Sequence, residues 1–92
     1  MHAVIGTVTI GAGQTDAARK SLKDDVVPRV KGAPGFVKGY WAASADGMHG
    51  TSMVLFKTKQ DADNAASMAR SMPRTPGVTL DSVEVREVIA EA

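Results

Sequence analysis

The sequence predicts an α+β domain in which two helices cover one face of a four-stranded antiparallel sheet. Alternating apolar and polar residues indicate the strands, apolar residues that recur every four positions indicate the helices, and the segments follow the order βαββαβ. This order is that of a ferredoxin-like fold, and it fills residues 1–92 as a single domain. The sheet of such a fold has a second face, and no segment is left over to cover it. We therefore expect a partner subunit or a ligand on that face.

The first strand is predicted over residues 2–10, where β-branched residues alternate loosely with others, and GAG at 11–13 ends it. Gly6 lies inside this strand. A glycine in that position usually marks a bulge or a close approach of the backbone, and the alternative is that it leaves room for a ligand.

The first helix is predicted to begin at Thr15 and Asp16, which can cap its N-terminus and place a negative charge there. Pro28 lacks a backbone N–H, so we expect the last turn to kink or end at this residue. The apolar residues of the helix form one stripe that we expect to face the sheet: Ala18, Leu22, Val26 and Val30.

The second and third strands are predicted over residues 36–44 and 51–58, joined by a polar hairpin loop that contains His49. Alternation sorts the second strand into two faces. One face carries Phe36, Lys38, Tyr40, Ala42 and Ser44. The other face carries Val37, Gly39, Trp41 and Ala43.

The second helix is predicted to begin at Thr58, with Asp61 in the position of a capping box, and PRTPG at 73–77 is expected to end it. Its inward stripe is mostly alanine, which lets a helix sit close to a sheet or leaves a gap. The stripe consists of Ala62, Ala65, Ala66, Ala69 and Met72. A long last strand follows from Val78, with Val83, Val85 and Ile89 on one face and an end that reaches past its own domain.

Charge and composition exclude several classes of function. The net charge of +1 is spread without a basic run, so we expect no binding to nucleic acid or to an anionic membrane surface. The absence of cysteine excludes disulfides, thiolate metal sites and a cysteine nucleophile. The chain begins with a strand rather than a signal segment, and no apolar run has membrane-spanning length, so we expect a cytoplasmic protein.

Few residues offer reactive chemistry. His2 and His49 match no metal-ligand spacing, so we expect no metal site. The sequence has no serine–histidine–acid set and no glycine-rich phosphate loop, which removes the common hydrolase and transferase mechanisms. Trp41 and Tyr40 are the candidate ligand contacts, because rings supply most of the contact area in small apolar sites. The alternative is that these two rings pack in the core or in a dimer interface.

Several segments resemble one known group of proteins. They are VVPRVKGAPGF at the end of the first helix, GYW in the second strand, and VLFKT followed by KQDADNA at the junction of the third strand and the second helix. Together they resemble the dimeric α+β barrel superfamily, and within it the antibiotic biosynthesis monooxygenase-like group. The resemblance implies a homodimer whose subunits pack sheet against sheet, with the last strand locking the dimer. It also implies a ligand pocket in each subunit, between the sheet and the helices.

Characterised members of this group include monooxygenases that need no cofactor and act on polycyclic phenols, and enzymes that degrade haem. The haem-degrading members use an Asn on the first strand, a Trp on the third and a His on the second helix. Here the first strand offers Thr7 and Thr9, the Trp is on the second strand, and residues 59–72 contain no His, which disfavours haem degradation. The monooxygenases orient a phenol with Asn, Trp, Tyr and Arg side chains. The counterparts available here are Trp41, Tyr40 and Arg86.

Two functions follow as hypotheses. The first is a homodimeric monooxygenase that uses no cofactor and holds a small aromatic or polyketide-type metabolite against Trp41 and Tyr40. The second is a dimer of the same fold without catalytic activity that binds a small molecule or serves assembly, and the shortage of ionisable groups at inward positions favours it. The sequence does not decide between them.

Overall fold

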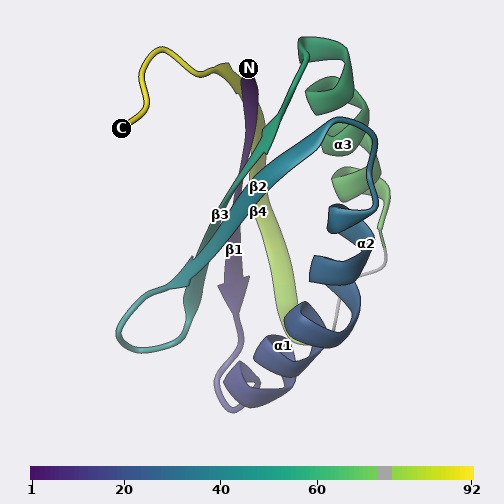
Figure 1. Cartoon of the computed structure of the whole chain (residues 1–92). Coiled ribbons are helices and arrows are strands. Elements are labelled where there is room, and N and C mark those ends of the chain that lie inside the picture. Colours follow the sequence, from purple (N-terminus) through teal and green to yellow (C-terminus); the bar gives the residue numbers. More distant parts are fainter. Residues whose placement is uncertain (73–75) are drawn as a thin grey trace.

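The computed structural model describes residues 1–72 and 76–92 and confirms the predicted ferredoxin-like fold (Figure 1). Residues 73–75, which belong to the segment predicted to end the second helix, lie outside the described residues. In chain order the elements are β1 (His2–Ile10), α1 (Thr15–Ser21), the π-helical turn η1 (Leu22–Val26), α2 (Val27–Lys31), β2 (Phe36–Ala43), β3 (His49–Phe56), α3 (Lys59–Ser71) and β4 (Val78–Glu87).

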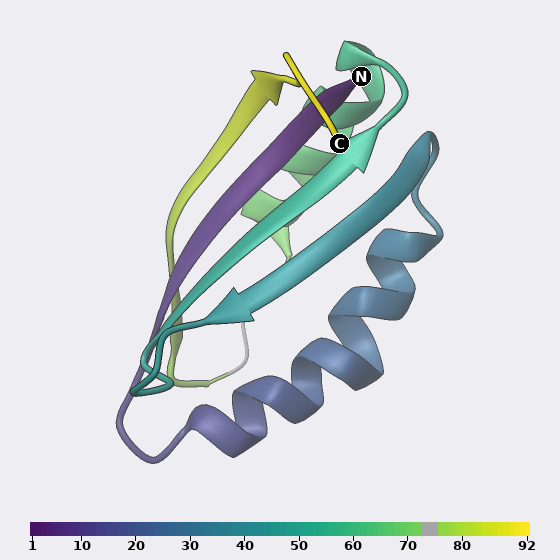
Figure 2. The same cartoon turned by 60° about the vertical axis from the view of Figure 1, so that its left-hand side comes forward.

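The four strands form one antiparallel sheet in the order β2-β3-β1-β4. The helices lie on one side of this sheet, so its other side is free of chain except near the ends of the strands (Figures 1 and 2). β3 begins and ends two residues earlier than predicted, so His49 is the first residue of the strand and pairs with Thr9. We call the sheet side that faces the helices the helix face and the other side the open face.

The first helix differs from the prediction at both Thr15 and Pro28. Its N-cap is Gln14 without a side-chain hydrogen bond, and Thr15 is already helical, so the expected cap at Thr15 is wrong. The helical path also continues through Pro28 to Lys31. Pro28 is the second residue of α2 and directly follows η1. The irregularity instead lies before it, in η1, where the Val27 N–H donates to the Leu22 carbonyl five residues back.

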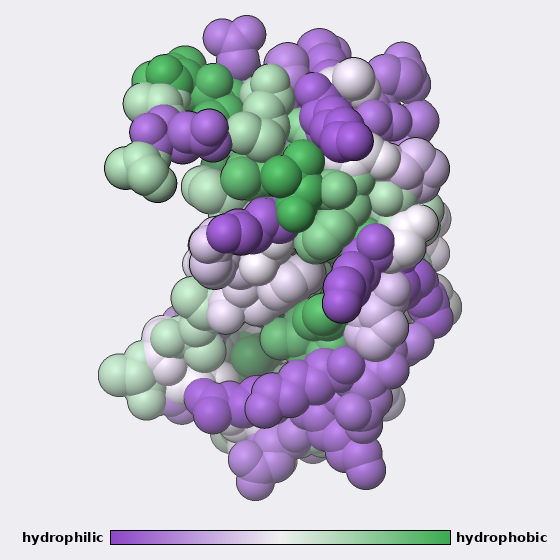
Figure 3. Space-filling view, viewed as in Figure 1, coloured by the Kyte–Doolittle hydropathy of each residue, from purple (hydrophilic) through white to green (hydrophobic). Residues whose placement is uncertain are grey.

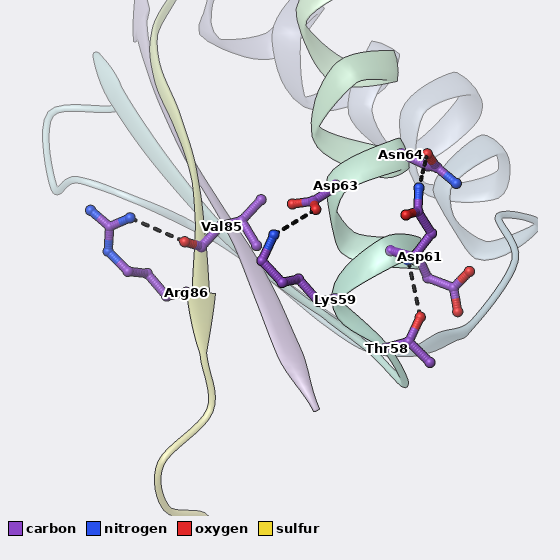
Figure 4. Close-up of polar contacts among 8 residues, drawn as sticks. Thr58, Lys59, Asp61, Asp63, Asn64, Val85 and Arg86 are labelled. Atoms are coloured by element: carbon purple, nitrogen blue, oxygen red, sulfur yellow. Dashed lines mark hydrogen bonds and ion pairs between the residues drawn. The ribbon is translucent and has the colours of Figure 1, made fainter.

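Helix α3 begins as predicted. The Thr58 side chain accepts a hydrogen bond of 3.1 Å from the Asp61 N–H, and the first turns carry an exposed ion pair of 2.8 Å between Lys59 and Asp63 (Figure 4). Ala62 and Ala66 are fully buried against the sheet, because a methyl side chain allows a close approach. α3 therefore anchors the helical layer.

The core is small and lies between α3 and the centre of the sheet. Its buried residues are Val4, Val54, Phe56, Ala62 and Ala66. Phe36 packs onto it, with its ring edge-to-face against Phe56 at a centroid distance of 6.4 Å. The prediction that Phe36 shares a face with Lys38 and Tyr40 is therefore wrong. The β2–β3 register shifts between Phe36 and Lys38, and the extra residue turns Phe36 to the helix face.

The last strand is shorter than predicted. β4 ends at Glu87, and Ile89 is 90% exposed in the tail beyond it, so Ile89 does not share a strand face with Val83 and Val85. The tail turns toward the open face of the sheet (Figure 1). β4 is also an edge strand, and two of its carbonyls accept hydrogen bonds from arginine: Val83 from Arg70 at 3.0 Å and Val85 from Arg86 at 3.1 Å (the second in Figure 4). These bonds occupy groups that a further strand would otherwise use.

We expect Gly35→Ala to lower the free energy of unfolding by about 2 kcal/mol, and Gly13→Ala by about 1 kcal/mol. Both glycines have a left-handed backbone, with φ of 78° and 80°. A Cβ on Gly35 would lie within 2.8 Å of the Cβ of Asp61, whereas a Cβ on Gly13 would have nothing within 4 Å. Urea denaturation of the two variants measures the difference, and equal losses would show that Asp61 moves aside without cost.

No helix among the described residues is long and apolar enough to cross a membrane. The same residues contain no group of three or more His, Asp or Glu side chains that could hold a metal ion.

Candidate functional site

A cavity of about 870 Å³ lies between the helix face of the sheet and the segment α1–η1. Figure 3 shows apolar side chains at the bottom of a hollow, beside a band of hydrophilic residues on the surface of the protein. The volume is within the range of about 300–1,000 Å³ that is usual for small-molecule sites. The cavity is therefore the candidate ligand site.

The roof of the cavity is the apolar stripe of the first helix. Ala18, Leu22, Val26 and Val30 face the sheet as predicted and line the cavity. They are only half-buried, and none of the residues of α1, η1 or α2 is fully buried. The stripe therefore borders the cavity along its length, and only Val30 at its end also packs against the core.

Small residues at the centre of the sheet form the floor of the cavity and add to its depth. Gly6 pairs with Ser52, and Val8 pairs with Gly50. A Cβ on Gly6 would lie 3.0 Å from Ser52 Oγ, and a Cβ on Gly50 would lie 2.9 Å from Val8 Cγ2. Gly6 thus has both of the roles considered from the sequence: it permits a close approach of Ser52, and it leaves space above the floor.

Trp41 forms one wall of the cavity. It lies in the same cross-strand row as Ser52, Gly6 and Val83. Its indole ring lies over Gly39, where a Cβ would come within 2.7 Å of Cη2, so only a glycine fits beneath the ring. The ring touches the core cluster on one side and the cavity on the other. Trp41 therefore packs against the core and also lines the cavity.

The hairpin between β2 and β3 lies at one end of the cavity. Thr15 Oγ1 donates a hydrogen bond of 3.2 Å to the Gly47 carbonyl, which joins the start of α1 to this loop. Within the loop, Asp46 accepts bonds from the Ser44 hydroxyl at 2.6 Å and from the Met48 N–H at 2.9 Å. The bond from Ser44, followed by that from Met48, lowers the pKa of Asp46 below its ordinary value.

The cavity offers little acid–base chemistry. Ser52 Oγ lies at the floor, and within the described part of the chain it has no hydrogen-bond partner. Arg19, Lys23 and Asp25 stand at the borders. Neither histidine lines the cavity: His49 is exposed at the start of β3, and His2 lies outside the lining with its Nδ1 buried and without a partner. Such a site can enclose an apolar molecule and form a hydrogen bond with it, but the described residues that line it include no buried base to take a proton.

The three residues predicted as ligand contacts are not brought together in one subunit. Trp41 is on the helix face, whereas Tyr40 and Arg86 are on the open face. Tyr40 is 59% exposed, and the Lys38 ammonium lies 5.9 Å from the centre of its ring. Arg86 forms an exposed ion pair of 2.6 Å with Glu84.

No protein-family model matches the sequence, and no curated protein matches it. Solved structures do match over the whole chain. MhuD, crystallised as a point mutant with two manganese protoporphyrin IX molecules per active site, is 15% identical with a TM-score of 0.76, and the match covers 100% of this chain and 98% of that one. HapK from Hahella chejuensis is 10% identical with a TM-score of 0.70, and the match covers 100% and 96%.

A third match is the monooxygenase from the gene ActVA-Orf6 of Streptomyces coelicolor in complex with nanaomycin D, at 15% identity, a TM-score of 0.58 and coverage of 99% and 92%. The chain has the fold of these proteins. This confirms, at the level of the fold, the resemblance to the antibiotic biosynthesis monooxygenase-like group. Identities of 10–15% extend the likeness no further than the fold.

Proposed function

We propose that the protein is a homodimeric, monooxygenase-like enzyme that binds a small aromatic metabolite between the helix face of its sheet and its first helix. One observation carries the proposal: an apolar cavity of about 870 Å³ with the only Trp of the chain on its wall. An aromatic wall and an aliphatic roof suit a flat ring system, which gains contact area and stacking without a charged partner. Ser52 Oγ supplies a hydrogen bond at the floor to fix its orientation.

Two solved structures with this fold contain ring-shaped ligands. One of them was crystallised with nanaomycin D and another with manganese protoporphyrin IX, so the fold accommodates ring systems of both sizes. A porphyrin fits the present cavity poorly, because neither His2 nor His49 lines it and no imidazole is there to coordinate a metal. We therefore propose a metal-free phenol-type ligand.

The lack of a base in the cavity is compatible with one kind of oxidation. A phenol that loses its own proton to give a carbanion can react with oxygen directly, and the protein then contributes positioning and dry surroundings. With anthrone, a tricyclic phenol in its keto form, the balanced reaction is anthrone plus O₂ giving anthraquinone plus water. Oxygen is the oxidant, and the methylene carbon of anthrone is oxidised to a carbonyl.

The first test is anthrone turnover, followed in an oxygen electrode and by the absorbance of anthraquinone. The proposal expects oxygen uptake well above the spontaneous rate. The second candidate function, binding without catalysis, is favoured by the shortage of ionisable groups at the cavity. It predicts a change in the fluorescence of Trp41 on addition of anthrone with no gain in oxygen uptake. If anthrone produces neither signal, the cavity is not a site for this class of ligand.

We expect Ala18→Phe to weaken anthrone binding at least about tenfold and to lower turnover in parallel, because the new ring occupies the cavity under the roof. The matched control is Ala17→Phe. Ala17 is exposed on the same helix and does not line the cavity, so this variant should bind anthrone as the parent does. Both variants keep Trp41 as the sole Trp, so fluorescence titration reads them directly. Equal affinities of the two variants would place the ligand elsewhere.

The proposed homodimer is formed by the open face of the sheet. Its apolar residues include two that are exposed in the single subunit, Tyr40 and Met53, and Ile5 and Leu55 stand beside them in the sheet. The C-terminal tail and the β2–β3 hairpin project from the two ends of this face, and Figure 3 shows the surface receding between them. A domain of 92 residues gains stability when such a face is covered by a second copy.

We expect Met53→Glu to convert the dimer to a monomer, because it places a carboxylate in the centre of the proposed apolar interface. Met68→Glu is the control. Met68 is also 44% exposed, as Met53 is, but it lies on α3 away from the open face. Sedimentation velocity at micromolar concentration gives the subunit count. A parent protein that sediments as a monomer, or a Met68→Glu variant that dissociates equally well, would contradict the proposed interface.

A further inference from the structure

Two cationic residues stand along one border of the cavity roof. Arg19 and Lys23 are four residues apart on α1–η1, and both line the cavity. Side chains four positions apart lie on the same side of a helix, so these two flank the apolar stripe on one side. Ser21 and Asp25 line the cavity at the other border of the stripe. The cavity therefore has one border with two positive charges and one without.

Among the residues that the structure describes, none neutralises the positive border. Asp25 is already paired with Arg29 at 2.8 Å. Neither the Arg19 side chain nor the Lys23 side chain has an ion-pair or hydrogen-bond partner among the residues that the structure describes. Two cations next to an apolar hollow, without a partner among the described residues, attract an anion whose apolar part fills the hollow.

We infer that the ligand is an aromatic carboxylate, whose rings lie in the cavity and whose carboxylate lies between Arg19 and Lys23. This inference rests on the proposed function, since it specifies the ligand class of the same site. The guanidinium of Arg19 can bind the carboxylate with two parallel hydrogen bonds, and the ammonium of Lys23 adds a second charge-assisted donor. The rings then extend from the border into the cavity, over the floor at Ser52 and against Trp41 on the wall.

The test compares two probes with the same rings, anthracene-2-carboxylate and anthracene-2-carboxamide, by isothermal titration calorimetry at pH 7.5 and low salt. We expect the carboxylate to bind about three- to tenfold more tightly, because both cations are exposed to solvent and each contributes modestly. The preference should decrease with added salt. It should disappear in the double variant Arg19→Gln/Lys23→Gln, to which the two probes should bind equally.

The control removes the same charge from the same helix. Lys20 and Lys31 are exposed and do not line the cavity, so Lys20→Gln/Lys31→Gln should keep the preference for the carboxylate. If the parent protein binds both probes equally, the inference is overturned while the proposed aromatic site stands. If the preference survives Arg19→Gln/Lys23→Gln, the anion binds elsewhere and the assignment is overturned. If neither probe binds, the inference and the proposed function both fail.

Discussion

Phe56→Ala should lower the free energy of unfolding by about 3–5 kcal/mol, which is the usual cost of removing a buried aromatic ring. Phe56 is 1% exposed and is the largest fully buried side chain among the described residues. The other buried members of its cluster are valines and alanines, which are too small to collapse into the space that the ring would leave. Because a domain of this size has a total stability of only about 5–15 kcal/mol, the variant should be close to unfolding at 37 °C.

Urea denaturation followed by circular dichroism measures this loss. Phe36→Ala is the control, because Phe36 contacts the same ring edge-to-face but is only half-buried. It should lose clearly less stability than Phe56→Ala. A loss below about 2 kcal/mol for Phe56→Ala would mean that the core relaxes around the missing ring, contrary to the close packing of α3 on the sheet.

Gly39→Ala should displace the ring of Trp41, with two measurable effects. The new Cβ would lie 2.7 Å and 2.8 Å from Cη2 and Cζ3 of the indole, so the ring must leave its place over β2. We expect a loss of about 1–3 kcal/mol in the free energy of unfolding, as is usual for an overpacked site. We also expect anthrone to bind about tenfold more weakly, because the displaced ring enters the cavity that it now borders.

A double-mutant cycle separates this contact from a general effect on the strand. In the Trp41→Ala background no indole is present, so Gly39→Ala should be neutral or slightly stabilising, since alanine loses less entropy than glycine in a strand. The coupling between the two positions should then exceed about 1 kcal/mol. Additive effects, or an unchanged Trp41 emission maximum in Gly39→Ala, would show that the ring does not need Gly39.

Much of the fold could be predicted because local patterns and the global structure agree. The cap at Thr58, the alanine stripe of α3 and the stripe from Ala18 to Val30 all depend on spacing within one element. The face of Phe36 could not be predicted in this way. It depends on the extra residue in β2 opposite β3, and that shift is fixed by the packing of two phenyl rings from different strands.

The candidate site was predictable only in part. Gly6 and Trp41 are visible in the sequence as unusual strand residues. Alternation places Gly39 on the same face of the second strand as Trp41. That Gly6, Gly50 and Ser52 meet in the middle of one floor depends on the register between β1 and β3, which the sequence of either strand does not specify. The cationic border could not be predicted from the sequence either. The sequence assigns Arg19 and Lys23 to the solvent-exposed face of the helix, and only the structure shows the cavity beside them.

The helix that roofs the cavity has a further consequence for how a ligand enters. Because no residue of α1, η1 or α2 is fully buried, this segment owes little of its stability to packing, unlike α3 with its two buried alanines. Its backbone amides should therefore exchange with solvent through a local opening that costs less than global unfolding. Hydrogen exchange should therefore show faster exchange in the first helix than in α3 and the central strands. The proposed ligand would then lose part of its affinity to the entropy cost of ordering this segment, and a change that stabilises the first helix should strengthen binding.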